Sequence, residues 1–166
     1  MKWNSKEEAV IAHREHPCNR VCHDGRAKVR VDAVFNVILP QSRVLDLGCN
    51  DGDFGNMLIK EKDCQVYGVD VSEKVGIKAI ENGVIFSCCD ASRLPFETGF
   101  FDFVNASEFL EHILSIGEVL TEVKRVLKSG GIFLGTVPHP DIENLDEEKY
   151  HCNAFTHKIL TDLLSD

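Results

Sequence analysis

Residues 44–55 read VLDLGCNDGDFG and hold the pattern that decides the fold. An apolar run predicts a strand over 43–47, and an amphipathic stretch predicts a helix over 53–61. Gly48 and Gly52 stand between them. Glycine adopts backbone angles closed to other residues and has no side chain, so a ligand can lie against the main chain there. The stretch therefore predicts a tight strand-to-helix turn beside a ligand, although two glycines alone also fit a plain turn.

The same alternation continues along the chain. Apolar runs predict further strands over 64–70, 84–90, 100–106 and 132–138. Periodic apolar residues and end signals predict helices over 5–15, 26–38, 73–82 and 155–164, and one within 116–131 that ends at Gly130-Gly131. Near-continuous apolar strands that alternate with helices predict an α/β, doubly wound, mostly parallel sheet with helices on both faces.

Composition places the chain among ordinary globular proteins. Its 166 residues fit a single domain, 1–166, with 43% hydrophobic and 27% charged residues. The formal net charge of -9 argues against capture of nucleic acid or of an anionic membrane. No apolar run approaches the roughly 18 residues that span a bilayer.

The cysteines bear on the compartment. There are seven, an odd number, and Cys88 and Cys89 are adjacent. The N-terminal stretch MKWNSKEEAV is polar and lacks the apolar core of a signal peptide. We therefore expect reduced, mostly buried thiols in a cytoplasmic protein.

Acidic residues follow the predicted strands. Asp46, Asp70 and Asp90 stand at the ends of the first three. In parallel sheets ligands bind beyond the carboxyl ends of the strands, so these residues are expected to share one site. Asp70 comes 18 residues after Gly52, about where a carboxylate accepts both hydroxyls of a ribose.

The segment CCDASRLPF supplies the groups for a purine base. Asp90 is placed to accept a hydrogen bond from an adenine amino group, and the Ala91 amide to meet a ring nitrogen. Val71 and Leu94 offer apolar contact to the ring. Together with Asp70 these residues describe an adenosine site.

Five segments, in order and spacing, resemble the motifs of class I S-adenosylmethionine-dependent methyltransferases: VLDLGCNDG, VYGVDVS, CDASRLPF, FDFVNASEFLEHI and EVKRVLKSGGIFLGTVP. The resemblance covers about residues 30–165 and is closest to small-molecule O-methyltransferases such as the ubiquinone-pathway family. It implies a Rossmann-like fold and S-adenosylmethionine as cofactor.

The resemblance also assigns roles. Asp46 and Gly48 would lie beside the methionine part of the cofactor, Asp70 would hold the ribose and Asp90 the adenine. Asn50 stands where the family usually has glycine, and asparagine is among the residues better tolerated at positive φ. The complete expected cofactor site is Asp46, Gly48, Asn50, Gly52, Asp70, Val71, Asp90, Ala91 and Ser107.

The segment SEFLEHI suggests a second constellation. In a helical turn, Glu108, Glu111 and His112 fall at i, i+3 and i+4 and face one way, which suits magnesium or manganese. With the later His151, the pattern resembles metal-binding ubiquinone-pathway and small-RNA 2′-O-methyltransferases. The alternative is a metal-free Glu-His turn that shapes the acceptor side. In either case His112 is a candidate proton acceptor from a hydroxyl.

The N-terminal segment HREHPCNRVCH offers a zinc alternative: His13, His16, Cys18, Cys22 and His23. No second cysteine pair stands at finger spacing. The favoured interpretation is a helical lid over residues 1–25, as in the family, with the core over 26–166.

The C-terminus is expected to be abbreviated. The family usually continues past a last helix such as 155–164 into an antiparallel strand pair. We therefore expect the sheet to lack its last strands. The missing strands would be supplied by a longer gene product, by a second copy or another partner, or not at all; an exposed apolar edge favours association.

The resulting prediction is methyl transfer from S-adenosylmethionine to a small-molecule or saccharide acceptor, at oxygen. One alternative is a catalytically silent or partner-completed S-adenosylmethionine-binding domain. A remote one is an NAD-dependent dehydrogenase, whose G-x-G-x-x-G fingerprint fails at two of three positions in residues 48–53.

Overall fold

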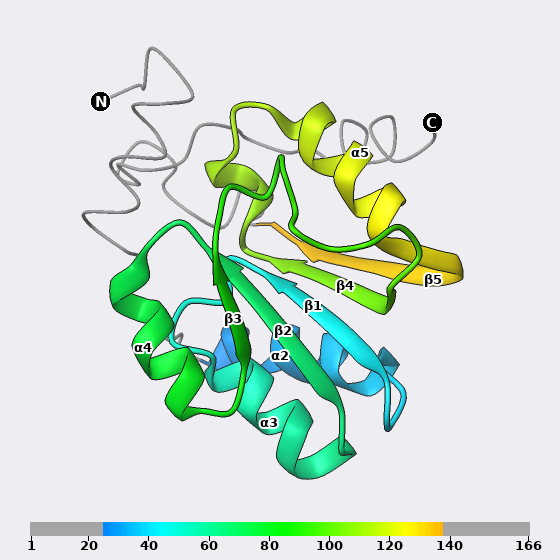
Figure 1. Ribbon diagram of the computed structural model, residues 1–166. Helices are drawn as coiled ribbons and strands as arrows, with labels where there is room; N and C mark the ends of the chain where they lie inside the picture. The colour runs from blue at the N-terminus through cyan, green and yellow to red at the C-terminus, as the bar shows by residue number, and fades with distance from the viewer. Residues whose placement is uncertain (1–24, 138–166) are drawn as a thin grey trace.

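The computed structural model describes residues 25–137 (Figure 1). Its elements are α2 (Gly25–Val37), β1 (Arg43–Leu47), α3 (Asp53–Lys62), β2 (Gln65–Asp70), α4 (Glu73–Glu81), β3 (Ile85–Cys88), β4 (Phe101–Ser107), the 3-10 helix η1 (Leu110–His112), α5 (Ile116–Val126) and β5 (Leu127–Thr136). The predicted helices 5–15 and 155–164, the N-terminal lid with its zinc alternative, and His151 lie outside the described residues.

The five strands form one sheet in the order β3-β2-β1-β4-β5, and every neighbouring pair is parallel. The chain builds outward from β1 to β3, then returns to the other side of β1 to add β4 and β5. This reversal places a topological switch point between β1 and β4, where such sheets bind ligands. The predicted α/β, doubly wound parallel sheet is confirmed.

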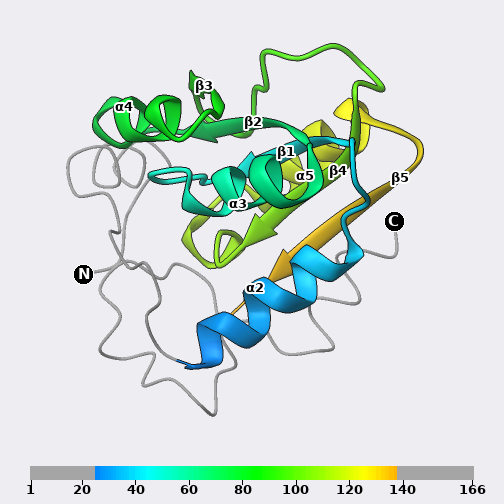
Figure 2. The same ribbon diagram turned by 90° about the horizontal axis from the view of Figure 1, so that it is seen from below.

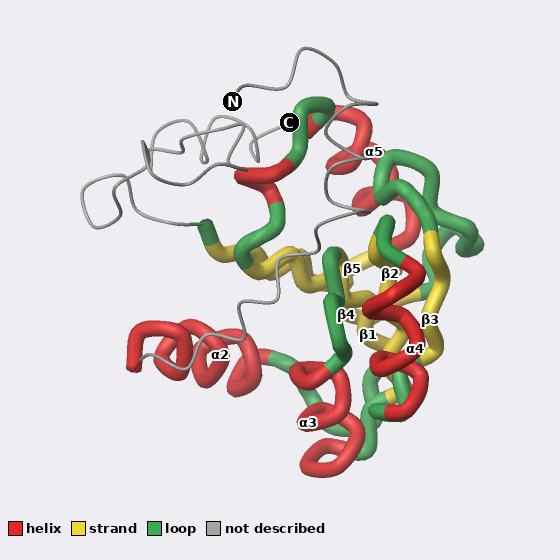
Figure 3. The backbone as a smooth tube through the Cα atoms, turned by 90° about the vertical axis from the view of Figure 1, so that its left-hand side faces the viewer, coloured by secondary structure: helices red, strands yellow, loops and turns green. Residues whose placement is uncertain are grey.

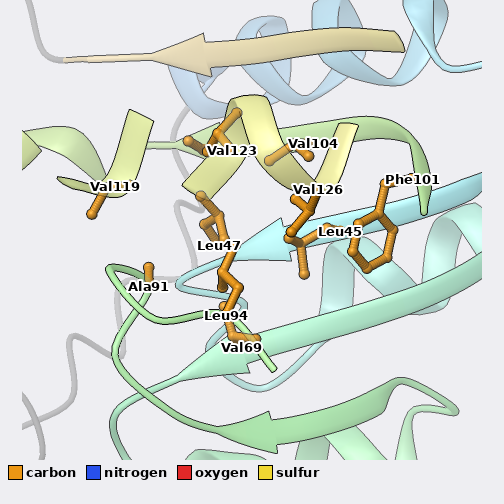
Figure 4. Packing of buried hydrophobic residues seen from close by; sticks show 11 residues of the cluster. Leu45, Leu47, Val69, Ala91, Leu94, Phe101, Val104, Val119, Val123 and Val126 are labelled. Carbon is orange, nitrogen blue, oxygen red and sulfur yellow. The ribbon is translucent and has the colours of Figure 1, made fainter. Parts of the chain in front are cut away.

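Helices cover both faces of the sheet. Figures 1 and 2 show α5 on one face and α2, α3 and α4 on the other, and Figure 3 shows the same division from the side. On the α5 face, Val119 and Val123 pack with Leu45 and Leu47 of β1 (Figure 4). On the opposite face, Val44 packs in a second cluster that includes residues of α2, α3 and α4.

Both faces of the central strand are therefore buried. Alternate residues of β1 belong to the two clusters, because successive side chains of a strand point to opposite faces. This explains why the predicted strands read as apolar runs rather than as polar-apolar alternation. The strand predicted over 43–47 has the bounds that the structure gives it.

The end of α5 was predicted wrongly. The helix ends at Val126 and not at Gly130-Gly131, and β5 begins at Leu127 instead of 132. Leu127 already pairs with Phe101 of β4, and a register irregularity follows before the regular pairing resumes. Gly130, at φ 79, lies within this irregular stretch. Because Leu127 pairs with β4, the chain from Leu127 onward forms a strand and does not continue the helix.

Two smaller expectations also change. Strand β3 covers Ile85–Cys88 rather than 84–90, so Asp90 lies in the loop beyond it. The four cysteines of the described residues are free thiols, but only Cys49 and Cys64 are buried, while Cys88 is exposed. Among the helices of residues 25–137, none is both long enough and apolar enough to cross a membrane.

Candidate functional site

The turn after β1 has the left-handed geometry that its sequence requires. The φ angles are 67° at Gly48, 49° at Asn50 and 78° at Gly52. The Gly48 amide donates to the Val69 carbonyl of β2 at 2.8 Å, and the Gly52 amide closes the turn on the Cys49 carbonyl at 3.0 Å. Asparagine tolerates the left-handed region better than most residues, so Asn50 keeps the turn where the family usually has glycine.

The two glycines of the turn serve different purposes. A Cβ on Gly48 would lie 2.6 Å from Cδ2 of Phe109, whereas one on Gly52 would lie 2.9 Å from the Cα of Ala79 in α4. Gly52 therefore lets α4 pack against the turn. At both glycines a Cβ would meet the protein itself, so the close approach of a ligand there stays a prediction.

Asp70, the last residue of β2, links the turn to the next loop. Its two carboxylate oxygens accept hydrogen bonds from the amides of Asn50 at 3.3 Å and Ser72 at 2.9 Å. A carboxylate has about four lone-pair sites, so it can accept further bonds from a ligand. Asp70 thus lies at the carboxyl end of its strand, as the ribose assignment requires.

The loop after β3 carries the candidate adenine groups. The Asp90 carboxylate accepts a hydrogen bond from the Ser92 amide at 2.9 Å, which rigidifies the loop. Ala91 and Leu94 are buried in the cluster under α5, and Val71 is half-buried. The Cys89 amide donates to the Asp70 carbonyl at 3.1 Å, so the ribose and adenine candidates lie on adjoining loops.

A charged pair on α5 holds this loop in place, and sequence reasoning missed it. The guanidinium of Arg125 donates to the carbonyls of Leu94 at 3.0 Å and Phe96 at 2.7 Å, while Glu122 accepts from the Leu94 amide at 2.8 Å. Arg125 also binds Glu122 directly at 2.7 Å. These bonds hold the pKa of Glu122 below its usual value.

We expect the substitution Arg125→Met to loosen the loop after β3. It removes two hydrogen bonds to backbone carbonyls, which contribute about 0.5–1.5 kcal/mol each. The free energy of unfolding in urea should fall by about 1–3 kcal/mol, with weaker binding of adenosine. Lys124→Met, an exposed position of the same helix, is the matched control. Equal stability of the two variants would contradict the role of Arg125.

A buried polar chain crosses from β1 to β4. The side-chain amide of Asn105 donates to the Asp46 carboxylate at 2.7 Å, and the Ser107 hydroxyl donates to the Asn105 amide oxygen at 2.7 Å. Asp46 and Asn105 are 5% and 2% exposed. Asn105 was not among the predicted site residues. A buried asparagine in an otherwise apolar strand was the available signal.

Burial changes the ionisation of the Asp46 carboxyl. It raises the pKa of Asp46 from 3.8 to about 7, although the hydrogen bond from Asn105 opposes the change; the negative charge of Asp70 adds to it. The same burial, with the charges of Asp46 and Asp70, raises the pKa of the Cys49 thiol above its usual value. Cys49 is therefore a neutral packing residue and not a nucleophile.

The SEFLEH segment does not form the expected helical turn. Glu108 has φ 50°, and the helical residues begin only at Leu110, so the i, i+3, i+4 argument was wrong for Glu108. Its carboxylate accepts from the Thr136 hydroxyl at 2.8 Å and lies 3.6 Å from Nε of Arg30. Within residues 25–137 no group of three or more His, Cys, Asp or Glu side chains is arranged to hold a metal.

Glu111 and His112 lie together beyond β4. Glu111 is 1% exposed, and its Oε1 lies 3.8 Å from Nε2 of His112, whose side chain is 16% exposed. Next to them Phe109 packs on Gly48. The His112 side chain is partly exposed, which keeps it a candidate for proton transfer.

Comparison with known proteins agrees with this geometry. Residues 45–135 match a family described as "Methyltransferase domain". The chain is 33% identical over 119 residues to 27-O-demethylrifamycin SV methyltransferase of Amycolatopsis mediterranei, covering 64% of this chain and 44% of that protein. It is 34% identical over 103 residues to the ubiquinone/menaquinone biosynthesis C-methyltransferase UbiE of Desulfotalea psychrophila, covering 58% and 42%.

A solved structure is similar as well. The [4+2]-cyclase SpnF aligns with a TM-score of 0.60 and 32% identity, covering 64% of this chain and 43% of that one. The chain thus spans less than half the length of these three relatives. Their printed names include transfer to oxygen, transfer to carbon and a cyclisation, so similarity alone does not identify an acceptor.

Proposed function

The chain belongs to the methyltransferase domain family, and from this premise we propose that it binds S-adenosylmethionine and transfers the methyl group to a small-molecule or saccharide acceptor, at oxygen. The observation that carries the proposal is the convergence of the turn 48–52, Asp70 and Asp90 at the carboxyl ends of three adjacent parallel strands. Free thiols at the described cysteines fit a cytoplasmic location for the reaction.

The residues present fit the cofactor. Asp70 would accept the ribose hydroxyls and Asp90 the adenine amino group, with Ala91 and Val71 beside the ring. Asp46, close to Ser107 through Asn105, would face the methionine end. S-adenosylmethionine supplies a methyl group already activated by its sulfonium.

The chain's own contribution is then alignment and proton transfer. The hydrogen-bonded loops after β1, β2 and β3 would hold the cofactor and align it with the acceptor, and such alignment is a main source of rate in displacements of this kind. His112 would take the proton from the acceptor hydroxyl, with Glu111 beside it to stabilise the imidazolium. The Glu108 carboxylate accepts a hydrogen bond from the Thr136 hydroxyl, so the proposal assigns it no role as a metal ligand and takes no step through a metal.

The test is direct binding followed by transfer. Calorimetry with S-adenosylmethionine and S-adenosylhomocysteine should detect binding, and NADH should not bind. A radiolabelled methyl-transfer screen across hydroxyl, amine and carbon acceptors then identifies the acceptor class. Binding of NADH without binding of the methyl donor would overturn the proposal.

A second candidate is a cofactor-binding domain without transferase activity, or one that acts only when a partner completes the sheet. One observation favours it: a similar solved structure is titled a cyclase and not a methyltransferase. Cofactor binding without transfer to any acceptor class would support this candidate. Light scattering would show whether the protein forms a dimer, in which a second copy could complete the sheet.

A further inference from the structure

The polar chain Asp46–Asn105–Ser107 is built by the register of the sheet. Asp46 of β1 pairs directly with Asn105 of β4, and Ser107 lies two residues further on the same face. The Ser107 hydroxyl donates to the amide oxygen of Asn105. This bond orients the amide so that its N–H group points at the Asp46 carboxylate.

The surroundings of Asp46 disfavour a negative charge. Among the described residues the Asn105 amide is its one hydrogen-bond donor, and the side chain is withdrawn from water. Two other titratable groups interact with it: Asp70, the last residue of β2, and the Cys49 thiol in the turn. Neither supplies a positive charge. A carboxyl in such a place is easily protonated in the empty site.

We propose that Asp46 loses a proton when the cofactor's methionine group binds, so that cofactor binding is linked to pH. Asn105 is the positioning residue that holds the Asp46 carboxyl in place. This inference rests on the proposed function, because it concerns the same cofactor. The methionine group carries an ammonium, and in S-adenosylmethionine a sulfonium as well. Either cation favours the ionised carboxylate beside it.

The linkage between proton binding and cofactor binding sets the size and the sign of the change in affinity with pH. Below its pKa of about 7, Asp46 is protonated in the empty site, and binding must expel the proton. The affinity should therefore rise by about tenfold between about pH 6 and pH 8 and then level off. Close to one proton should be released per ligand at pH 6, and almost none at pH 8.

The experiment is calorimetry with S-adenosylhomocysteine across this range. Running it in two buffers of different ionisation enthalpy measures the protons released as well as the affinity. Adenosine, which lacks the methionine group, should bind with no pH dependence between pH 6 and 8. The same dependence for adenosine would assign the titration to another group, such as Asp70, and overturn the inference.

Variants then test the two residues. Asp46→Asn should abolish the pH dependence. Asn105→Ala removes the donor and should move the midpoint up by about one pH unit, so that affinity at pH 7 falls about fivefold. Ser107→Ala should move the midpoint in the same direction by less. Asp102→Asn, at the opposite end of β4, is the control and should leave the pH profile unchanged.

Each outcome separates the two proposals. If S-adenosylhomocysteine binds equally at pH 6 and pH 8, or if Asp46→Asn keeps the dependence, the linkage is wrong while the proposed function stands. If neither S-adenosylhomocysteine nor S-adenosylmethionine binds at any pH, the proposed function itself is wrong. Unchanged adenosine affinity in Asn105→Ala confirms a folded pocket, and an unmoved midpoint in that variant would overturn the role of Asn105.

Discussion

Replacing Asp70 by alanine should weaken the binding of S-adenosylmethionine by at least about tenfold, and by about 100-fold or more if both ribose hydroxyls lose their acceptor. Hydrogen bonds to a charged group contribute about 1.5–3 kcal/mol each, and each 1.4 kcal/mol is about a factor of ten. The carboxylate also accepts hydrogen bonds from the amides of Asn50 and Ser72. The measured loss of affinity therefore includes the effect of loosening both loops in the variant.

The measurement is calorimetry with the cofactor and with its demethylated product. Asp70→Asn retains the shape and one acceptor oxygen, and should fall between the wild type and alanine. Glu81→Ala, an exposed acid at the end of α4, is the matched control for the loss of a negative charge. Full affinity in Asp70→Ala would remove the residue from the ribose site.

The substitution Gly68→Ala should destabilise the protein by about 1–3 kcal/mol, the usual cost of overpacking a core. A Cβ at this central position of β2 would lie 2.6 Å from Sγ of Cys49 and 2.7 Å from Cγ1 of Val84. Both neighbours are buried, at 6% and 4% exposure, so neither can move without shifting the turn or the strand.

Urea denaturation measures this change as a lower midpoint at a constant slope. Gly117→Ala in α5 is the matched control, because nothing lies within 4 Å of its Cβ and alanine stabilises a helix by about 0.5–1 kcal/mol. Adding Cys49→Ala to Gly68→Ala should recover part of the loss, since the nearest atom is removed. Equal midpoints for Gly68→Ala and the wild type would contradict the packing argument.

Local patterns predicted most of the elements because the inner strands β1, β2 and β4 are mostly buried and therefore read as apolar runs. The run around Leu45 and Leu47 is apolar throughout, and its end at Gly48 is marked by a residue that takes positive φ. The candidate cofactor residues Asp70 and Asp90 were also found this way, since in parallel sheets the residues after each strand converge on one edge.

Longer-range contacts explain the failures. The helix of α5 carries a clear glycine stop signal at Gly130, but pairing of Leu127 with Phe101 ends it earlier. Glu108 fits a helical spacing with Glu111, yet its left-handed backbone and its bond to Thr136 take it out of the turn. In both cases a partner distant in sequence outweighs the local preference.

The sequence by itself determined the class of fold, the turn geometry at residues 48–52 and the placement of acidic residues at the carboxyl edge of the sheet, because these depend on side-chain period and backbone freedom. Only the tertiary structure decided that Asn105 pairs with Asp46, that Arg125 holds the loop at Leu94, and that Gly52 serves the packing of a helix. Such roles depend on strand register and helix placement, which bring together residues far apart in the chain and leave no periodic trace in it.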